Sequence, residues 1–297
     1  MRYCRFSSAL DPDQGSLGSS FYAWVEERED ALWAVASMPA PVEDLAAQAA
    51  PLLRFEPTPL SRLRLLPAVA PSKIVCVGRN YRDHAAELGN EVPREPLLFL
   101  KPPSSLLGSA GIIRLPALSK RVDYEGELGI VIGNRCRNIG PDEDVRRYIR
   151  GYVCVNDVTA RDLQKSDGQW TRGKGFDTFC PVGPIVSDEI DPIGGAPVTV
   201  TTHINGVLKQ TGSTADFLFG IPELLRYITA FCTLEPGDLI PTGTPAGVGS
   251  LASGDRMEVT VHGLGVLENT VESARTSLLQ EFRSGGARKA AADPAMR

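Results

Sequence analysis

The sequence predicts a mixed α+β fold in which β-strands outnumber helices. Short apolar runs of strand length recur along the chain, and 29 glycines and 23 prolines are scattered between them, which favours frequent turns over long helices. Only a few segments have the spacing of an amphipathic helix, and they do not alternate regularly with the strands. This order argues against a repeated strand–helix–strand unit.

Residues 1–66 are predicted to form a small β-rich domain of their own. Their apolar runs favour strands at residues 2–6, 21–25 and 31–36 and a short helix from Val42 to Leu53. The proline-punctuated stretch from Pro57 to Pro71 is typical of a linker. We therefore place the main domain at residues 67–275, followed by a tail at 276–297 whose small and charged end is predicted to be disordered.

The main domain opens with the strand-like run K-I-V-C-V-G at residues 73–78. Asn80 is a good N-cap and Gly89 a good terminating residue, so a short helix is predicted from Tyr81 to Leu88. A polar, proline-containing loop then leads to the strand L-L-F-L-K at 97–101. Further strands are predicted at Glu127–Ile132, Gly151–Asn156, Val198–Ile204, Asp238–Ile240 and Arg256–Val261, with a tight Asn205-Gly206 hairpin turn. A second helix is predicted from Pro222 to Cys232, with Leu224, Leu225, Ile228 and Phe231 on one face.

Charge and composition exclude several classes of partner. The net charge is −5 and no basic stripe occurs, which argues against nucleic acid. We find no signal peptide and no apolar run long enough to span a bilayer, so we expect a soluble cytoplasmic protein without a membrane partner. The six cysteines are well separated and several lie in apolar runs, which is typical of buried, reduced thiols.

Three acids form the strongest candidate site. Glu125 and Glu127 stand two residues apart in Y-E-G-E-L-G-I-V-I-G, so on a strand they share a face, and Asp157 ends the apolar run G-Y-V-C-V-N-D. Carboxylates gathered at the ends of buried strands repel one another unless a hard cation lies among them. Oxygen-only ligands favour Mg²⁺, with Mn²⁺ as the alternative, over zinc. The competing interpretation is an exposed strand face followed by a turn aspartate.

His84 and Glu87 lie three apart on the predicted short helix and therefore share a face. A histidine oriented by a carboxylate can act as a general base for water. An isolated pair of this kind is also common on a solvated surface, and that interpretation stays open. The two other histidines, His203 and His262, are predicted to be structural.

Two further segments carry polar residues after the acids. Arg161 and Gln164 follow Asp157, and Lys174 lies between two glycines with aromatic residues on either side, so it could meet an anionic substrate or be a solvated loop lysine. The glycine loop P-T-G-T-P-A-G-V-G at 241–249 could offer backbone N–H groups to an oxyanion or be a plain turn. Motifs of P-loop, dinucleotide-binding and G-x-S-x-G hydrolase sites are missing from the sequence.

The order of these segments resembles the fumarylacetoacetate hydrolase family. The resemblance rests on V-G-R-N-Y-R-D-H-A-A-E, L-F-L-K-P, Y-E-G-E-L-G-I-V-I-G, G-Y-V-C-V-N-D-V-T-A-R-D-L-Q, W-T-R-G-K-G-F-D-T-F-C-P-V-G-P and G-T-P-A-G-V-G, and it covers about Lys73 to Val271. It is similar to the branch of acylpyruvate hydrolases, oxaloacetate decarboxylases and hydroxyheptadienedioate isomerases. It implies a mixed β-sandwich roll, a homodimer and a small keto or diketo acid as substrate.

The resemblance also implies roles for the candidate residues. It makes Glu125, Glu127 and Asp157 the ligands of Mg²⁺, without a fourth acid from the segment before His84. His84 and Glu87 become the water-activating pair on a lid-like helix, Lys174 lies at the metal and substrate, and Thr178 is a neighbour. Arg161 and Gln164 line the pocket, Gln164 is a candidate oxyanion donor, and Thr244, Gly243 and Lys101 are predicted to contact the substrate.

The function implied is Mg²⁺-dependent hydrolysis of a carbon–carbon bond in a β-diketo acid of the acylpyruvate or fumarylpyruvate type, through a metal-stabilised enolate. Decarboxylation of an oxaloacetate-type acid and isomerisation of 2-hydroxyhepta-2,4-diene-1,7-dioate would use the same metal and lysine, and both stay open. A non-catalytic paralogue that only binds metal or ligand is the remaining alternative. Only hydrolysis needs the histidine–glutamate pair to generate a nucleophile.

Overall fold

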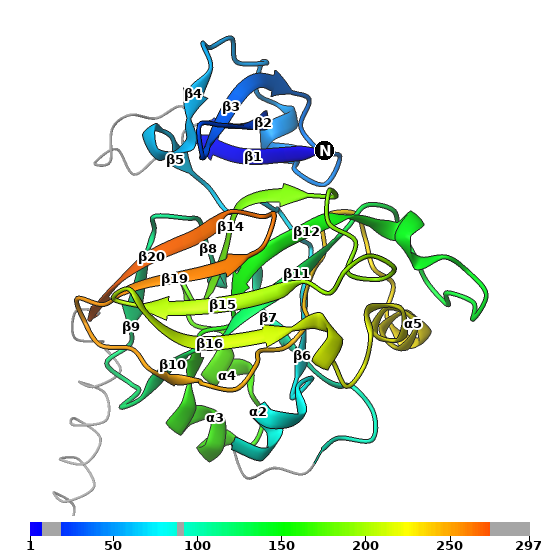
Figure 1. The fold of residues 1–297 in the computed structure, drawn as a ribbon, viewed down its shortest axis with the longest axis vertical. Helices are drawn as coiled ribbons and strands as arrows, with labels where there is room; N and C mark the ends of the chain where they lie inside the picture. The colour runs from blue at the N-terminus through cyan, green and yellow to red at the C-terminus, as the bar shows by residue number, and fades with distance from the viewer. Residues whose placement is uncertain (8–18, 88–91, 274–297) are drawn as a thin grey trace, which may run out of the picture.

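The computed structural model describes residues 1–7, 19–87 and 92–273, without the side chains of residues 84–86. It is β-rich, as predicted, with the N-terminal strands at one end of a larger two-sheet body (Figure 1). The predicted tail from residue 276 and the C-terminal end of the predicted helix at Leu88 lie outside the described residues. Within the described ranges, no helix combines the length and the apolar character that crossing a bilayer demands.

The larger sheet runs through both the N-terminal and the main segments. Its path is β4-β3-β2-β1-β14-β12-β11-β17-β6-β7, with β5 paired to β1 and β8 to β14. The strands are β1 (Arg2–Ser7), β2 (Ser20–Arg28), β3 (Ala31–Met38), β4 (Thr58–Pro59), β5 (Arg64–Leu65), β6 (Ile74–Gly78), β7 (Leu97–Lys101), β8 (Leu106–Leu107), β11 (Gly126–Ile132), β12 (Ile149–Asn156), β14 (Cys180–Ser187) and β17 (Leu239–Pro241).

The N-terminal strands join the main sheet through a short antiparallel contact. Arg2 pairs with Ser187 and Tyr3 with Val186, so β1 extends the sheet at β14. Residues of the predicted linker also pack on this sheet, because Ala68 and Val69 are buried in the same cluster as Val153. The domain boundary near residue 66 therefore stays a prediction, while the sheet itself is continuous across it.

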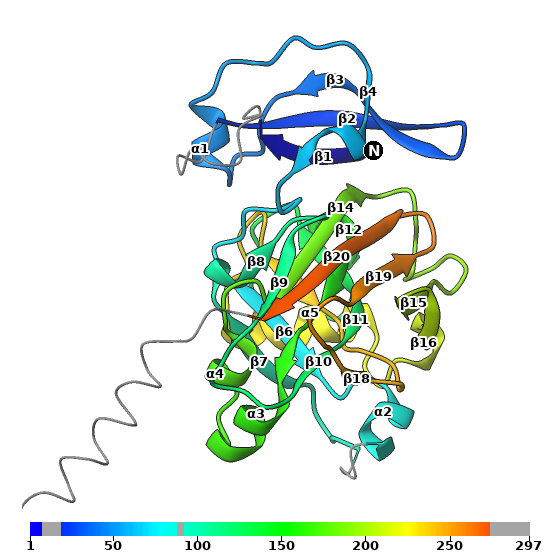
Figure 2. The same cartoon turned by 90° about the vertical axis from the view of Figure 1, so that its left-hand side faces the viewer.

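A second sheet packs on one face of the first, and Figure 2 shows it from the side. Its order is β16-β15-β19-β20-β9, and a small third sheet has the order β13-β10-β18. The predicted Asn205-Gly206 hairpin is confirmed, since both residues have positive φ (52° and 77°) between β15 and β16. The strands are β9 (Ile112–Leu115), β10 (Val122–Tyr124), β13 (Thr159–Ala160), β15 (Thr199–Ile204), β16 (Val207–Ser213), β18 (Gly249–Ser250), β19 (Arg256–Val261) and β20 (Val266–Ser273).

The helices are few and mostly short. In Figures 1 and 2, α2, α3 and α4 gather at the end of the body opposite the N-terminal strands. The first helix covers four residues rather than the predicted span from Val42 to Leu53, because Asp44 caps its start and Pro51 follows its end. The elements are α1 (Leu45–Gln48), α2 (Arg82–Glu87), α3 (Arg161–Asp167), α4 (Thr171–Lys174) and α5 (Ile221–Phe231), with 3₁₀ turns η1 (Leu60–Arg62), η2 (Pro103–Ser105), η3 (Val145–Tyr148) and η4 (Thr214–Asp216).

The prediction of which residues form the buried face of α5 is partly wrong. Leu224, Leu225 and Ile228 are buried in the core as expected, but Phe231 is 63% exposed. Phe231 is the last residue of the helix, and there the helix has passed the edge of the core. Its ring packs edge-on against Tyr227 instead, with ring centroids 6.4 Å apart.

Candidate active site

The three predicted acids come together at the end of the central strands. One carboxylate oxygen from each residue lies within 4.8 Å of those from the other two, and all three residues are buried, which confirms the expected convergence. The Asp157 N–H donates to the Glu125 carbonyl over 2.8 Å, which places the two residues side by side just beyond β12. Glu127 lies inside β11, whereas Glu125 occupies the break between β10 and β11. Glu125 and Glu127 therefore lie on either side of a strand boundary and do not share one regular strand.

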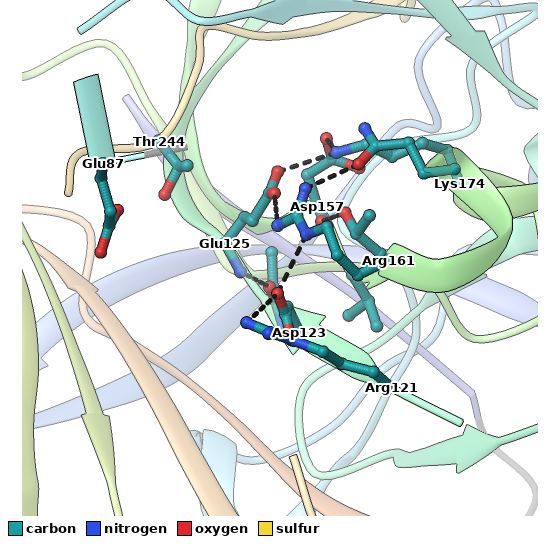
Figure 3. A network of polar contacts seen from close by, with 12 residues as sticks. Glu87, Arg121, Asp123, Glu125, Asp157, Arg161, Lys174 and Thr244 are labelled. Atoms are coloured by element: carbon teal, nitrogen blue, oxygen red, sulfur yellow. Dashed lines mark hydrogen bonds and ion pairs between the residues drawn. The ribbon is translucent and has the colours of Figure 1, made fainter. Parts of the chain in front are cut away.

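Two cations, one from α3 and one from α4, bond Glu125 and Asp157, as Figure 3 shows. The Lys174 ammonium donates to Glu125 Oε2 over 2.8 Å and to Asp157 Oδ2. It also lies 4.8 Å from the centre of the Phe99 ring. The Arg161 guanidinium donates to Glu125 Oε1 over 2.5 Å, which fixes the other oxygen of the same carboxylate. The Lys174 side chain is therefore part of the site and not a solvated loop lysine.

Lys101, which was expected to contact the substrate, lies on the buried side of the triad. Its ammonium donates to Asp157 Oδ1 over 2.5 Å and to the Val158 carbonyl over 3.1 Å. It is not among the described residues that line the cavity in front of the acids. The geometry gives it the task of orienting Asp157.

The electrostatics of the acids fit a hard divalent cation. Burial raises the pKa of Glu127 well above its usual range, and the neighbouring charges of Asp157 and Glu125 raise it further. Burial alone would lower the pKa of Lys174, but the carboxylates of Asp157 and Glu125 raise it. Lys174, Arg161 and Lys101 form ion pairs with Glu125 and Asp157. Among the described residues no cation forms an ion pair with Glu127, so this buried carboxylate lacks a direct counter-charge. The all-oxygen donor set of the triad is the kind that Mg²⁺ and Mn²⁺ bind.

The glycine loop after β17 lies beside Glu127. The Gly243 N–H donates to Glu127 Oε2 over 2.8 Å, so this amide holds the acid rather than facing free space. Gly243 has φ of 103°, and a Cβ there would lie 2.8 Å from the Cβ of Asn80. Thr244 donates its hydroxyl to the Gly126 carbonyl and accepts from Gln210, which locks the loop against β11.

The predicted histidine–glutamate pair lies on α2. The side chain of His84 lies outside the described residues, so its predicted role stays a prediction. The Glu87 carboxylate accepts from the Gly247 N–H over 3.1 and 3.2 Å, which ties the end of α2 to the glycine loop. The Thr178 hydroxyl accepts a hydrogen bond from the Arg114 N–H over 2.9 Å.

A cavity of about 360 Å³ opens in front of the triad. Gln164 accepts a hydrogen bond from Arg161 over 2.7 Å through its amide oxygen, which leaves its NH₂ group for the cavity. Arg161 thus orients both Glu125 and Gln164. The lining consists of Val77, Gly78, Arg79, Glu125, Glu127, Asp157, Arg161, Gln164, Lys165, Trp170, Lys174 and Thr244.

Several residues of the site escaped the sequence analysis. Asp123 is fully buried and accepts from Arg161 Nε and Arg121 Nε, both over 2.9 Å. The sequence did contain an indication of Asp123, because Asp123, Glu125 and Glu127 are spaced two residues apart and would share a strand face. Gln210 carried no such signal: it reaches the site from β16 and accepts from the Gly126 N–H over 3.0 Å.

Comparison with known proteins places this geometry among enzymes. The family model described as "Fumarylacetoacetate (FAA) hydrolase C-terminal" matches residues 73–272. A mitochondrial oxaloacetate decarboxylase from Dictyostelium discoideum is 45% identical over 65% of this chain and 89% of its own length.

Solved structures with this fold include an isomerase and a hydrolase. The 2-hydroxyhepta-2,4-diene-1,7-dioate isomerase from Mycobacterium marinum has a TM-score of 0.76 and 40% identity, covering 92% of this chain and 98% of its own. The fumarylpyruvate hydrolase from Pseudomonas aeruginosa, in complex with Mn²⁺ and pyruvate, has a TM-score of 0.63 and 31% identity, covering 71% and 92%.

Proposed function

The chain belongs to the fumarylacetoacetate hydrolase family, and on that premise we propose that it is a hydrolase that requires Mg²⁺ or Mn²⁺ and cleaves a carbon–carbon bond in a β-diketo acid of the acylpyruvate or fumarylpyruvate type. One observation carries the proposal. Three buried carboxylates, with Lys174 bonded to two of them, form the base of a cavity large enough for such an acid. A relative of this chain is a fumarylpyruvate hydrolase bound to Mn²⁺ and pyruvate, which supports the same chemistry here.

Glu125, Glu127 and Asp157 would hold the metal. When bound, a divalent cation supplies positive charge that polarises a keto oxygen and stabilises enolate charge. Arg161 holds the Glu125 carboxylate and Lys101 holds the Asp157 carboxylate, so these ligands keep their orientation without the ion. The Lys174 ammonium would neutralise part of the negative charge at the α-keto acid end of the substrate.

The chain's own residues then perform the hydrolysis. His84, oriented by Glu87, takes a proton from water, and the resulting hydroxide attacks the carbonyl carbon distal to the α-keto acid. The Gln164 NH₂ group steadies the oxyanion, and one donor of this kind is typically worth about 2.7–4 kcal/mol of barrier. The bond between that carbon and the adjacent methylene breaks. A carboxylic acid leaves, and the pyruvate-type enolate takes a proton at carbon.

A second candidate is decarboxylation of an oxaloacetate-type acid. The triad and Lys174 are suited to hold an enolate whichever bond is broken to form it. Loss of CO₂ yields the same enolate without an attacking water. The 45% identity to an oxaloacetate decarboxylase favours this alternative. The isomerase with 40% identity keeps proton transfer within a dienol diacid as a third use of the same site.

The deciding experiment replaces His84 with alanine and follows two reactions with Mg²⁺. We expect acylpyruvate and fumarylpyruvate hydrolysis to fall about a hundredfold or more, as for removal of a general base. Oxaloacetate decarboxylation would be little changed, because it needs no nucleophile. His262→Ala, at an exposed position in the loop between β19 and β20, is the matched control and should leave both rates unchanged. Hydrolysis at the full rate in His84→Ala, or in EDTA, would refute the proposed mechanism.

A further inference from the structure

Two cations of the cavity have no carboxylate partner among the described residues, and this sets them apart from the others. Arg161 and Lys174 are both bonded to acids of the site. Arg79 and Lys165 line the same cavity, and neither forms an ion pair with an acid of the described ranges. Guanidinium and ammonium groups that face a cavity without a counter-ion are candidates for binding an anion of the ligand.

Arg79 is held in place by its own backbone. It is a non-glycine residue with φ of 57°, a conformation that costs about 1–2 kcal/mol for such residues and persists only where the surroundings impose it. The next residue, Asn80, imposes it. The fully buried Asn80 side chain donates to the carbonyls of Phe219 and Thr242 and accepts from the Phe219 N–H, at 2.9–3.2 Å.

The side chain of Arg79 is placed by Trp170. Its guanidinium carbon lies 5.9 Å from the centre of the Trp170 ring, and the ring also packs edge-on against Phe99 at 5.2 Å. Gly78 leaves room for this ring, because a Cβ there would lie 3.0 Å from it. The Trp170 carbonyl accepts from the Lys174 N–H over 2.9 Å. One aromatic residue thus links Arg79 to the lysine at the metal end of the cavity.

From these contacts we infer that Arg79, assisted by Lys165, binds a second carboxylate at the far end of the substrate. The residue would select dicarboxylic keto acids over acids of the same length with an uncharged end. The inference rests on the proposed function for the identity of the reacting end, which the triad and Lys174 hold. It assigns the opposite end to two cations that the proposed chemistry does not use.

The test compares two substrates that differ only at the distal group. Fumarylpyruvate ends in a carboxylate, and crotonylpyruvate ends in a methyl group. In Arg79→Gln we expect kcat/KM for fumarylpyruvate to fall about ten- to hundredfold, mainly through KM, because a hydrogen bond to a charged group is lost. The value for crotonylpyruvate should stay within about twofold. Arg79→Lys should restore part of the preference, and Lys165→Gln should shift it in the same direction by less.

Binding gives a readout that does not depend on turnover. With Mg²⁺, calorimetric titration of 2-oxoheptanedioate should show about ten- to hundredfold weaker binding to Arg79→Gln, while 2-oxoheptanoate binds both proteins equally. Arg137→Gln, at an exposed arginine beyond β11, should bind both acids as the unmodified protein does. Equal effects of Arg79→Gln on charged and uncharged ligands, or no effect on either, would overturn the inference. Failure to hydrolyse either pyruvate derivative, with the charged ligand still favoured in binding, would refute the proposed function alone.

Discussion

Replacing Lys174 with methionine tests whether its ammonium and a divalent cation share the neutralisation of the acid triad. The side chain is buried, and its ammonium lies 2.8 Å from Glu125 Oε2 and in contact with Asp157. Removing one partner of a buried ion pair typically costs about 3–5 kcal/mol, because the other charge is left buried and uncompensated. We expect a loss of this size in the free energy of unfolding when the protein is measured in EDTA.

The loss should shrink when Mg²⁺ is present. The cation would neutralise the same carboxylates, so the variant regains part of its stability on binding it. By linkage, every 1.4 kcal/mol regained corresponds to about tenfold tighter Mg²⁺ binding than in the unmodified protein. The variant should therefore bind Mg²⁺ more tightly while losing activity, since Lys174 no longer stabilises enolate charge.

The assay is urea unfolding in EDTA and in saturating Mg²⁺, combined with calorimetric titration of the metal. Lys209→Met is the matched control, because Lys209 is an exposed lysine on β16. The free energy of unfolding of this variant should change by no more than about 0.5 kcal/mol. Equal losses in the two conditions, or weaker Mg²⁺ binding by the variant, would contradict the shared neutralisation.

Three further predictions follow from contacts around the site. Asp123→Asn removes the charge that fixes Arg161 and should weaken Mg²⁺ binding about 10–100-fold, and an unchanged affinity in a metal titration would show that Asp123 has no positioning role. Gly243→Ala should lower the free energy of unfolding by about 1–3 kcal/mol more than Gly254→Ala, because both have positive φ but only the first would press on Asn80; equal losses would count against the close approach. Burial raises the pKa of the five buried thiols, so Ellman's reagent at pH 8 should label about one thiol per native chain, at the half-buried Cys232, and six in denaturant.

The convergence of the acids could be predicted because its signals are local. Glu125, Glu127 and Asp157 lie at the ends of apolar runs, and the ladder between β11 and β12 brings these ends together. The regular strand that was expected through Glu125 is interrupted, because β10 turns to pair with β13 and β18 instead of continuing in the main sheet. A short sequence pattern does not record such a change of partner.

Other features depend on contacts between distant segments and left little trace in the sequence. Arg79 lies in the cavity only because Asn80 is bonded to the segments around Phe219 and Thr242. Lys101 is the last residue of β7, and nothing in the neighbouring sequence indicates that its ammonium turns inward to Asp157. The same holds for Tyr3, whose partner Val186 lies in β14, in the second half of the sequence.

The pairing of β1 with β14 has a practical consequence for dissecting the protein. A truncated version that starts at the catalytic segment would uncover the backbone N–H and C=O groups of β14 near Val186 and Ser187, which β1 now satisfies. Bare sheet borders of this kind recruit strands from other molecules. By covering this edge, β1 should prevent self-association through β14. Expression of the shortened protein would be expected to yield aggregates even with its metal ligands intact.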